Sequence, residues 1–200
     1  MKVETLVLGM VETNCYLVSE NGSLLIIDPA SSGRRLVDRI NRDYEGKLDG
    51  ILLTHGHFDH IGAVDHLVKE YGCPVYGCRD DEKLFTDAAV NSLMGMNATV
   101  KSPITWVKGN SMKVGSIIVK IYYTPGHSPG SVMYEIGGIL FSGDTIFHES
   151  VGRTDLYGGS FSQLKQSLDV LNSLPYDMVI CPGHGESTTV GHELRYNPFL

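Results

Sequence analysis

Three histidines and one aspartate lie within six positions of the chain, directly after the apolar run at residues 50–53. They are His55, His57, Asp59 and His60. Imidazole nitrogens and carboxylate oxygens are common ligands of zinc and related metal ions. Because burying three histidines beside an apolar strand without a metal ion or a polar partner costs free energy, a purely structural role is disfavoured. The cluster therefore predicts a metal centre.

Three further ligand-type residues, His127, Asp144 and His184, each follow a predicted strand and come directly after a glycine. Taken singly, such a histidine is more often structural, and such an aspartate more often belongs to a turn or cap. Loops at strand ends can converge on one rim of a layered fold, however, and binding sites form there. Seven candidates exceed the need of one tetrahedral ion and suffice for two metal ions with a water between them.

The remaining histidines and the cysteines have no comparable context. We expect His66, His148 and His192 to be surface or secondary residues. The cysteines are scattered and lack the C-x-x-C spacing of a zinc knuckle or redox pair, so we expect reduced and mostly buried thiols. They are Cys15, Cys73, Cys78 and Cys181.

The elements that must position these side chains alternate between β-rich runs and amphipathic segments. Apolar runs bounded by turn residues predict strands at residues 3–8, 15–19, 24–28, 48–53, 75–76, 117–123, 132–136, 139–142 and 178–181. Apolar residues at helical spacing predict helices at residues 33–40, 60–71, 81–87 and 161–174. The segment at residues 91–97 is ambiguous. The first three strands are expected to form an antiparallel meander.

The composition limits the class of molecule. The chain has 200 residues, of which 42% are hydrophobic, so we expect one globular domain spanning residues 1–200. Its formal net charge is −7 and no basic block is present, which argues against nucleic acid or an anionic membrane surface as a partner. No apolar run reaches about 18 residues, and the first residues do not resemble an export signal. We therefore expect a cytoplasmic protein with a small-molecule substrate, while the oligomeric state stays open.

At these ligand residues the chain resembles the metallo-β-lactamase superfamily and, within it, the short glyoxalase II-like hydrolases. The motifs that carry the resemblance occur in the family's order and are H-x-H-x-D-H at 55–60, T-P-G-H at 124–127, S-G-D at 142–144 and P-G-H-G at 182–185. The resemblance implies an α/β fold, the αβ/βα sandwich, in which two facing mixed sheets are flanked by helices. It places the metal ions at one edge of the sandwich.

The resemblance also implies roles for individual residues. His55, His57 and His127 would bind a first metal ion, Asp59, His60 and His184 would bind a second, and Asp144 would bridge both. Two such ions would generate a bridging hydroxide that attacks a carbonyl, with Asp59 as the catalytic residue that orients it. Zinc is the first expectation, while a mixed nitrogen and oxygen ligand set also accepts iron or manganese. A thiolate leaving group needs little acid assistance, which favours a thioester such as S-lactoylglutathione or a related hydroxyacyl thioester.

Differences between this sequence and other branches of the superfamily disfavour the functions of those branches. A β-lactamase is disfavoured because no export signal is expected and because Asp144 fits the glyoxalase pattern. Flavodiiron proteins carry a glutamate in place of His57, and nucleases are disfavoured by the acidic charge. A metal-stabilised binding module without activity would not need seven ligands.

Two alternatives stay open. The segment at residues 150–156 resembles both short glyoxalase II-like proteins and persulfide dioxygenases, which use one iron on this scaffold, so a mononuclear iron persulfide dioxygenase is the alternative function. Within that segment, Arg153 either contacts a substrate carboxylate or pairs with Asp155. Full-length glyoxalase II continues into a helical region that helps to bind glutathione, whereas this sequence ends at Leu200, so whether the chain binds the glutathione moiety stays open.

Overall fold

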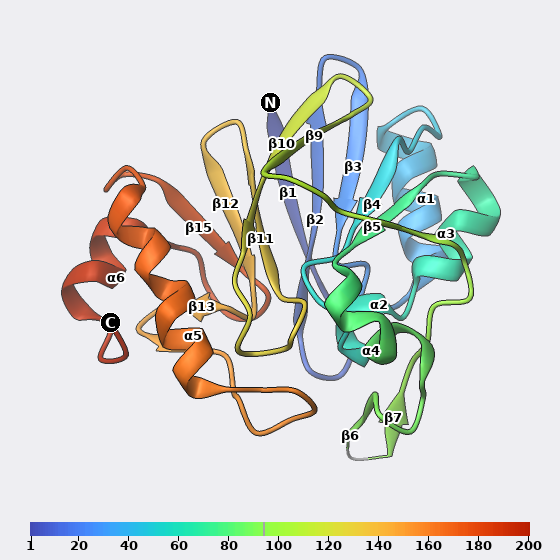
Figure 1. Cartoon of the computed structure of the whole chain (residues 1–200). Helices are drawn as coiled ribbons and strands as arrows, with labels where there is room; N and C mark the ends of the chain where they lie inside the picture. The colour runs from blue at the N-terminus through green and yellow to red at the C-terminus, as the bar shows by residue number, and fades with distance from the viewer. Residues whose placement is uncertain (94) are drawn as a thin grey trace.

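Two six-stranded β-sheets face each other in the middle of the molecule, and helices cover both outer sides (Figure 1). The computed structural model describes residues 1–93 and 95–200. The arrangement is the predicted αβ/βα sandwich. The ambiguous segment at residues 91–97 contains two short paired strands, β6 (Ser92–Leu93) and β7 (Met96–Asn97), while residue 94 lies outside the described residues.

The first sheet combines the predicted meander with parallel strands. In spatial order it contains β1 (Lys2–Leu8), β2 (Thr13–Glu20), β3 (Ser23–Ile27), β4 (Gly50–Leu52), β5 (Val75–Gly77) and β8 (Ile104–Trp106). Strands β1 to β3 pair antiparallel, and β3, β4, β5 and β8 pair parallel. Parallel neighbours need crossover connections. Helix α1 (Gly33–Asp43) connects β3 to β4, and helix α3 (Val64–Tyr71) lies between β4 and β5.

The second sheet is antiparallel except at one pair. In spatial order it contains β16 (Thr188–Thr189), β15 (Val179–Pro182), β12 (Ile139–Gly143), β11 (Val132–Ile136), β10 (Ile117–Tyr123) and β9 (Ser111–Val114). The parallel pair is β12 and β15, and its crossover contains helix α5 (Phe161–Leu168) and a 3₁₀ turn at Asp169–Ser173. A small hairpin of β13 (Ile146–Phe147) and β14 (Ser150–Val151) precedes this crossover.

The core lies in three layers because both faces of the central strands are buried. Side chains alternate across a strand, so Tyr16 and Val18 of β2 belong to the apolar cluster between the sheets, whereas Leu17 belongs to the cluster under the helices. Tyr134 and Phe141 of the second sheet complete the middle layer. The two sheets are therefore joined by one continuous apolar layer.

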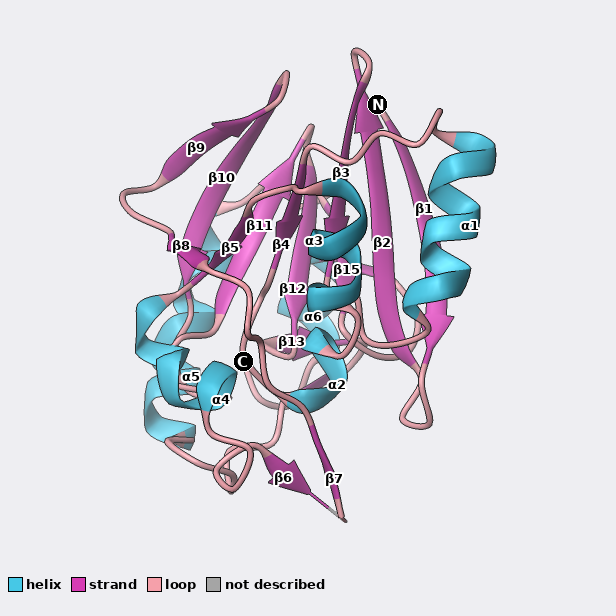
Figure 2. Cartoon of the chain, turned by 90° about the vertical axis from the view of Figure 1, so that its right-hand side faces the viewer, coloured by secondary structure: helices cyan, strands magenta, loops and turns pink. Residues whose placement is uncertain are grey.

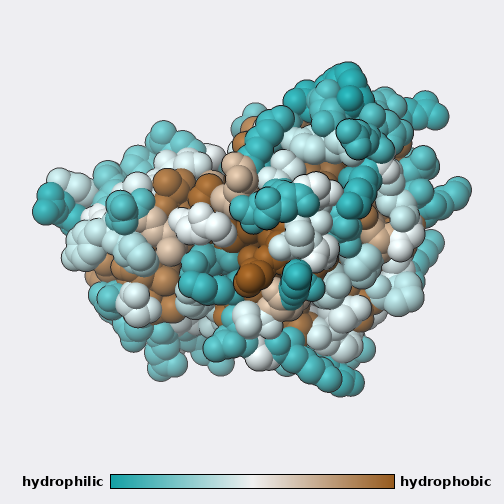
Figure 3. Space-filling view, turned by 90° about the horizontal axis from the view of Figure 1, so that it is seen from above, coloured by the Kyte–Doolittle hydropathy of each residue, from teal (hydrophilic) through white to brown (hydrophobic). Residues whose placement is uncertain are grey.

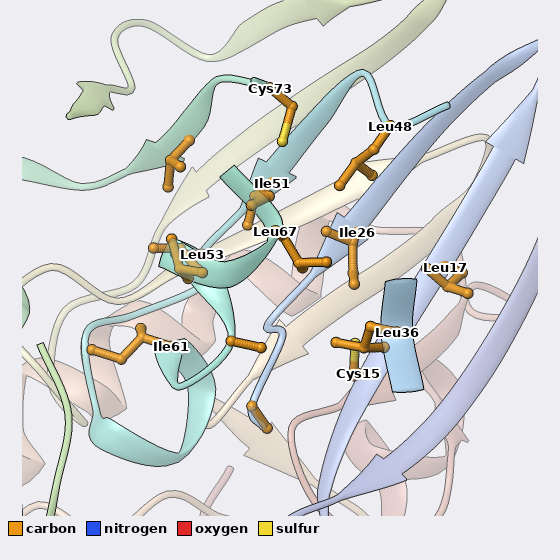
Figure 4. Packing of buried hydrophobic residues seen from close by; sticks show 14 of the residues in the cluster. Cys15, Leu17, Ile26, Leu36, Leu48, Ile51, Leu53, Ile61, Leu67 and Cys73 are labelled. Carbon is orange, nitrogen blue, oxygen red and sulfur yellow. The ribbon is translucent and has the colours of Figure 1, made fainter. Parts of the chain in front are cut away.

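Helices α1 and α3 cover the outer face of the first sheet (Figure 2). Leu36 of α1 and Leu67 of α3 pack with Ile26 and Ile51 of the sheet, as the close view of this cluster shows (Figure 4). Each such buried side chain contributes about 1.5–3 kcal/mol relative to exposure. Helices α5 and α6 (Val190–Tyr196) cover the second sheet in the same way, through residues such as Leu164.

Two predicted helices differ from the structure. The helix expected at residues 60–71 is divided into α2 (Phe58–Ile61) and α3, and at the break the N–H of Ala63 donates to the carbonyl of Pro29 at 2.9 Å in place of a helical partner. Gly62 packs closely on the backbone of Ala30, where a side chain would overlap the carbonyl oxygen. The helix expected at residues 161–174 ends its α-helical part at Leu168.

Other elements agree with the sequence patterns or lie outside them. The helix expected at residues 81–87 is α4 (Glu82–Thr86), after a 3₁₀ turn at Arg79–Asp81. The sequence patterns do not predict β8, β9, β13, β14, β16 or α6. The four cysteines are buried free thiols, as predicted.

The face seen in Figure 3 shows hydrophobic residues gathered in the middle between polar margins. Helix α2 and the β13–β14 hairpin, which neighbour the ligand-type residues, lie toward the lower part of Figure 1.

Within the described part of the chain, no helix has both the length and the apolar character needed to cross a membrane.

Candidate metal centre

The seven ligand-type residues lie just after four strands and come together at one edge of the sandwich. His55, His57, Asp59 and His60 follow β4, His127 lies between β10 and β11, Asp144 follows β12, and His184 follows β15. All seven belong to overlapping groups whose nitrogen and oxygen atoms lie within 4.8 Å of one another in each group.

The first group consists of His55, His57 and His127, all of them buried. Nε2 of His127 lies 3.2 Å from Nε2 of His55 and 2.8 Å from Nδ1 of His57. His57 therefore presents Nδ1 to the group, whereas the other two present Nε2. The two-residue spacing of His55 and His57 places both rings on one side of the chain, as the sequence predicts.

The second group consists of Asp59, His60 and His184. Oδ2 of Asp59 lies 3.5 Å from Nε2 of His60 and 3.2 Å from Nε2 of His184. Asp59 and His60 lie on α2, while His184 lies in the loop after β15. The start of β2 holds that loop in place, because Asn14 donates hydrogen bonds to the carbonyls of Pro182 and Gly185.

Asp144 lies between the two groups. Its Oδ2 is 3.6 Å from Nε2 of His127 and 3.5 Å from Nε2 of His184, and its Oδ1 is 3.4 Å from Nε2 of His60. One carboxylate thus faces ligand atoms of both groups.

These separations fit metal ions. Ligand atoms about 2.0–2.2 Å from a tetrahedral ion lie roughly 3.3–3.6 Å from each other. Four of the pairs above are 3.4–3.6 Å apart, and the other three, at 2.8–3.2 Å, are somewhat shorter. Nε2 of His60 and Oδ1 of Asp144 are also buried without a hydrogen-bond partner among the described residues. Since buried polar atoms are normally paired, these atoms are suited to a ligand. The donor set therefore fits divalent metal ions.

Groups behind the histidines fix their ring orientation. His60 donates from Nδ1 to Asp28 at 2.9 Å, His127 donates to the carbonyl of Arg153 at 2.7 Å, and His184 donates to the carbonyl of Val11 at 3.0 Å. Such partners select the tautomer whose other nitrogen can bind a metal. For these three histidines, Nε2 is therefore left to face the cluster. His55 is the fourth, because its Nδ1 can donate to the hydroxyl of Thr54 at 3.1 Å.

Two buried aspartates that the sequence analysis did not single out support the site. Asp28 accepts hydrogen bonds from the N–H and the hydroxyl of Thr54, in addition to His60. Asp81 accepts hydrogen bonds from the N–H groups of Gly56 and Gly130, which joins the His55–His57 turn to the loop that contains His127. An aspartate after an apolar strand was the available signal for Asp28, but it does not identify a partner.

The electrostatic environment differs between the two groups. Burial, together with the neighbouring histidines, lowers the pKa of His55 and lowers the pKa of His57 to about 3. Burial also opposes protonation of His60, but Asp144 and the other nearby carboxylates outweigh it and raise the pKa of His60. The pKa of His184 is raised in the same way, mainly by Asp59. The carboxylates therefore favour positive charge at the second group, which suits a cation.

A pocket of about 320 Å³ opens over this cluster. Its lining combines His57, Asp59, His127, Asp144 and His184 with apolar residues, which include Val11, Phe58, Leu93, Phe147 and Leu156. The side chain of Arg153 also lines it and forms a two-point ion pair with Asp155, with nitrogen–oxygen distances of 2.7 and 2.8 Å. Of the two roles expected for Arg153, the structure shows the pairing.

The order and geometry of these groups match a known family. The model of the metallo-beta-lactamase superfamily matches residues 8–184, which is most of the chain. The chain belongs to the metallo-beta-lactamase superfamily. The family and the histidine and aspartate clusters imply divalent metal ions, and together with curated relatives they support a metal-dependent hydrolase.

Members of this superfamily with similar sequences span the same length. The chain is 35% identical to a probable metallo-hydrolase of Bacillus subtilis, over 100% of this chain and 98% of the relative. It is 32% identical to a hydroxyacylglutathione hydrolase of Haemophilus influenzae, again over 100% and 98%.

Two solved structures of the superfamily are also similar. The structure titled BLEG-1 B3 metallo-beta-lactamase superposes with a TM-score of 0.93 at 37% identity, covering 100% of this chain and 99% of that one. TTHA1623, solved in a di-iron-bound form, superposes with a TM-score of 0.90 at 36% identity, covering 98% and 100%.

Proposed function

We propose that this superfamily member is a binuclear metal-dependent hydrolase of thioesters, such as S-lactoylglutathione or a related hydroxyacyl thioester. The observation that supports it best is the position of Asp144, whose carboxylate oxygens lie 3.4–3.6 Å from ligand nitrogens of both groups. Seven ligand atoms arranged in this way exceed the need of one tetrahedral ion.

The proposed ligands follow the two groups. His55, His57 and His127 would hold the first ion, Asp59, His60 and His184 would hold the second, and Asp144 would contact both. Two divalent cations at this position would supply an acidified water and polarise a carbonyl oxygen. Zinc is the first expectation; the di-iron form of the similar TTHA1623 makes iron a specific second choice, with manganese as a third.

Asp59 would be the catalytic residue of the chain. Although burial raises its pKa, His60 and His184 outweigh burial and lower the pKa, so Asp59 is a carboxylate at neutral pH. The hydroxyl of Thr13 donates to Oδ2 of Asp59 at 3.2 Å and fixes its orientation. An oriented carboxylate can accept a hydrogen bond from the attacking water and aim it at the carbonyl, which is a positioning role more than a strong-base role.

The pocket suits an acyl substrate attacked by water. Among the described residues that line it, none is a serine or a cysteine, so this part of the wall offers no covalent nucleophile. The apolar residues Val11, Phe58 and Phe147 can contact an acyl or thioether group and exclude bulk water. The similarity to the Haemophilus influenzae hydroxyacylglutathione hydrolase supports the thioester class.

A β-lactam is the second candidate substrate, because the chain is 37% identical to a protein titled as a B3 metallo-beta-lactamase. A mononuclear iron persulfide dioxygenase remains the alternative from a different reaction class. It requires one metal ion and molecular oxygen, whereas either hydrolase requires neither oxygen nor a redox-active ion.

Parallel assays separate these functions. The purified protein, with its metal content measured, is given S-lactoylglutathione, a chromogenic cephalosporin and glutathione persulfide in separate reactions. We expect thiol release from the thioester, two metal ions per chain and a kcat/KM at least roughly 100-fold above that for the cephalosporin, a difference within the range that site contacts can produce. Faster cleavage of the cephalosporin than of the thioester would contradict the thioester assignment. Oxygen uptake with glutathione persulfide and one bound iron, together with no thiol release from S-lactoylglutathione, would establish the dioxygenase.

A further inference from the structure

Two histidines outside the proposed catalytic centre form a second cluster with a glutamate. His148 and Glu149 lie in the turn of the β13–β14 hairpin, and His192 lies on α6. Nε2 of His148 and Nε2 of His192 are 3.1 Å apart, and Oε1 of Glu149 lies 2.9 Å from His192 and 3.7 Å from His148. Three ligand-type atoms from two separate elements therefore converge on one point.

We propose that His148, Glu149 and His192 form a further binding site for a divalent transition-metal ion, with zinc as the best match. Ligand atoms around a tetrahedral zinc ion lie roughly 3.3–3.6 Å apart. The separations here are 2.9, 3.1 and 3.7 Å, so the two shorter ones would have to widen by a few tenths of an ångström when an ion binds. Two imidazoles and one carboxylate suit zinc, nickel or copper better than calcium or magnesium. The three side chains are about one third to one half exposed, so water can complete the coordination.

A carboxylate orients His148 from behind. Nδ1 of His148 lies 2.9 Å from Oε1 of Glu186, which leaves Nε2 to face His192. This arrangement of carboxylate, histidine and ligand position is typical of metal-binding histidines. Glu186 lies two residues after His184 in the sequence, so the cluster contacts the loop that contributes a ligand to the proposed catalytic centre.

The backbone around the cluster is held in place by other contacts. Glu149 has a φ of 53°, in the left-handed region that non-glycine residues rarely adopt. Its N–H donates to Oε2 of the fully buried Glu193 at 2.9 Å, which ties the hairpin turn to α6. Thr188 and Asn197 donate to the same Glu193 carboxylate. The ligand side chains are therefore presented by a fixed frame, which lowers the entropy cost of binding an ion.

A metal ion here would restrain one wall of the catalytic pocket. Phe147 precedes His148, lines the pocket and lies edge-on to the ring of His184 with 6.1 Å between ring centroids. An ion held by both the hairpin and α6 would limit movement of Phe147 relative to His184. The site would therefore be structural or regulatory, and it is independent of how many ions the catalytic centre holds.

Zinc titration of the fully loaded protein tests this site. Holoprotein is dialysed to remove loosely bound metal and titrated with zinc chloride by calorimetry, and zinc content is measured after gel filtration. We expect wild type to bind one zinc ion more per chain than His148→Gln and His192→Gln. His66→Gln, which removes an exposed histidine of α3, is the matched control and should bind as wild type does. Because the readout is a difference between variants, it does not depend on the stoichiometry or activity of the catalytic centre.

Two further measurements protect the test against misfolded variants. Glu186→Gln removes only the negative charge behind His148 and should weaken zinc binding about 10- to 100-fold. Added zinc should raise the Tm of wild type and of His66→Gln but not that of His192→Gln. Equal zinc uptake and equal Tm shifts in wild type and in the His148 and His192 variants would overturn the proposal and leave the cluster as a set of surface ion pairs.

Discussion

The carboxylate of Asp28 lies 2.9 Å from Nδ1 of His60, and its Oδ2 also accepts the hydroxyl of Thr54 at 2.6 Å. Thr54 in turn can accept a hydrogen bond from Nδ1 of His55, so one carboxylate orients a histidine of each ligand group. Asp28 is buried and has a φ of 50°, which turns the chain after β3 directly beneath the site. The segment after β3 thereby supports the metal centre without providing a ligand.

Asp28→Asn should weaken metal binding. Asparagine has one acceptor oxygen in place of two and carries no charge, so its amide nitrogen must face either the N–H of Thr54 or the Thr54 hydroxyl and Nδ1 of His60. Either arrangement weakens the hydrogen bonds that fix the His60 ring. We expect about 10- to 100-fold lower metal affinity, measured by competition with a chelator of known affinity. Asp49→Asn is the matched control, because Asp49 also accepts a hydrogen bond from a backbone N–H, that of Leu24, and is not among the groups around the site. Equal affinities in wild type and Asp28→Asn would remove Asp28 from the support of the site.

Gly183→Ala should displace Asp144. A Cβ at Gly183 would overlap Oδ1 of Asp144 and approach Cε1 of His60 to 2.8 Å. We expect lower metal content per chain and lower turnover, measured by elemental analysis and thioester assay. Gly185→Ala is the control, since its Cβ would meet no atom within 4 Å and only its φ of 75° is unfavourable. Full metal content in Gly183→Ala would contradict the prediction, because it would show that the loop accommodates the added methyl group without displacing Asp144.

Asp59→Ala should lower turnover by a factor of roughly 100 or more, the range for a lost general-base or positioning group. The physical reason is the loss of the carboxylate that would orient the attacking water and bind the second ion. Turnover is measured at saturating metal, and circular dichroism checks the fold. Unchanged turnover at full metal loading would exclude Asp59 from the reaction.

Arg153→Ala should leave metal content unchanged, because His127 donates to the backbone carbonyl of Arg153 and the side chain pairs with Asp155. Elemental analysis of Arg153→Ala and Asp155→Asn checks this. If the side chain also binds substrate, KM rises in Arg153→Ala but not in Asp155→Asn. Metal loss in Arg153→Ala would mean that the side chain holds the loop in position.

Local motifs explain how much of the site the sequence predicts. His55 and His57 are two residues apart after a strand, so their shared direction follows from backbone geometry alone, and the structure brings them together as expected. The groups that orient the histidines by hydrogen bonds, in contrast, could not be predicted from a local motif. Asp28 is 32 residues from His60 in the sequence, and the acceptor for His184 is a backbone carbonyl, which has no sequence signal.

In the fold, too, features set by local sequence were predictable, and features set by contacts between distant residues were not. The strands with strong apolar runs were predictable, whereas at the break between α2 and α3 the N–H of Ala63 donates to the carbonyl of Pro29, a distant partner that periodicity cannot show. Helix α6 has only a weak apolar pattern, and it is tied to the rest of the fold through the buried Glu193. His148 and His192 lie 44 residues apart, so only the tertiary structure shows that they meet.

Metal binding should release protons in a pH-dependent way. In the metal-free protein the pKa values of His60 and His184 are raised, whereas those of His55 and His57 are lowered. The first two therefore hold their protons to higher pH than an ordinary histidine and must lose them to bind a metal ion, while the latter two are already neutral near neutral pH. As the pH rises through the raised pKa values this release disappears, so apparent affinity increases with pH up to that point.

Calorimetry in buffers of different ionisation enthalpy, from about pH 6 to pH 9 around the usual histidine range, measures the number of protons released. Asp28→Asn provides the internal comparison, because Asp28 is one of the carboxylates that raise the pKa of His60. Without that charge His60 loses its proton at lower pH, so the variant should release fewer protons than wild type near neutral pH. Identical proton release in both proteins at every pH would show that Asp28 does not control the protonation of His60.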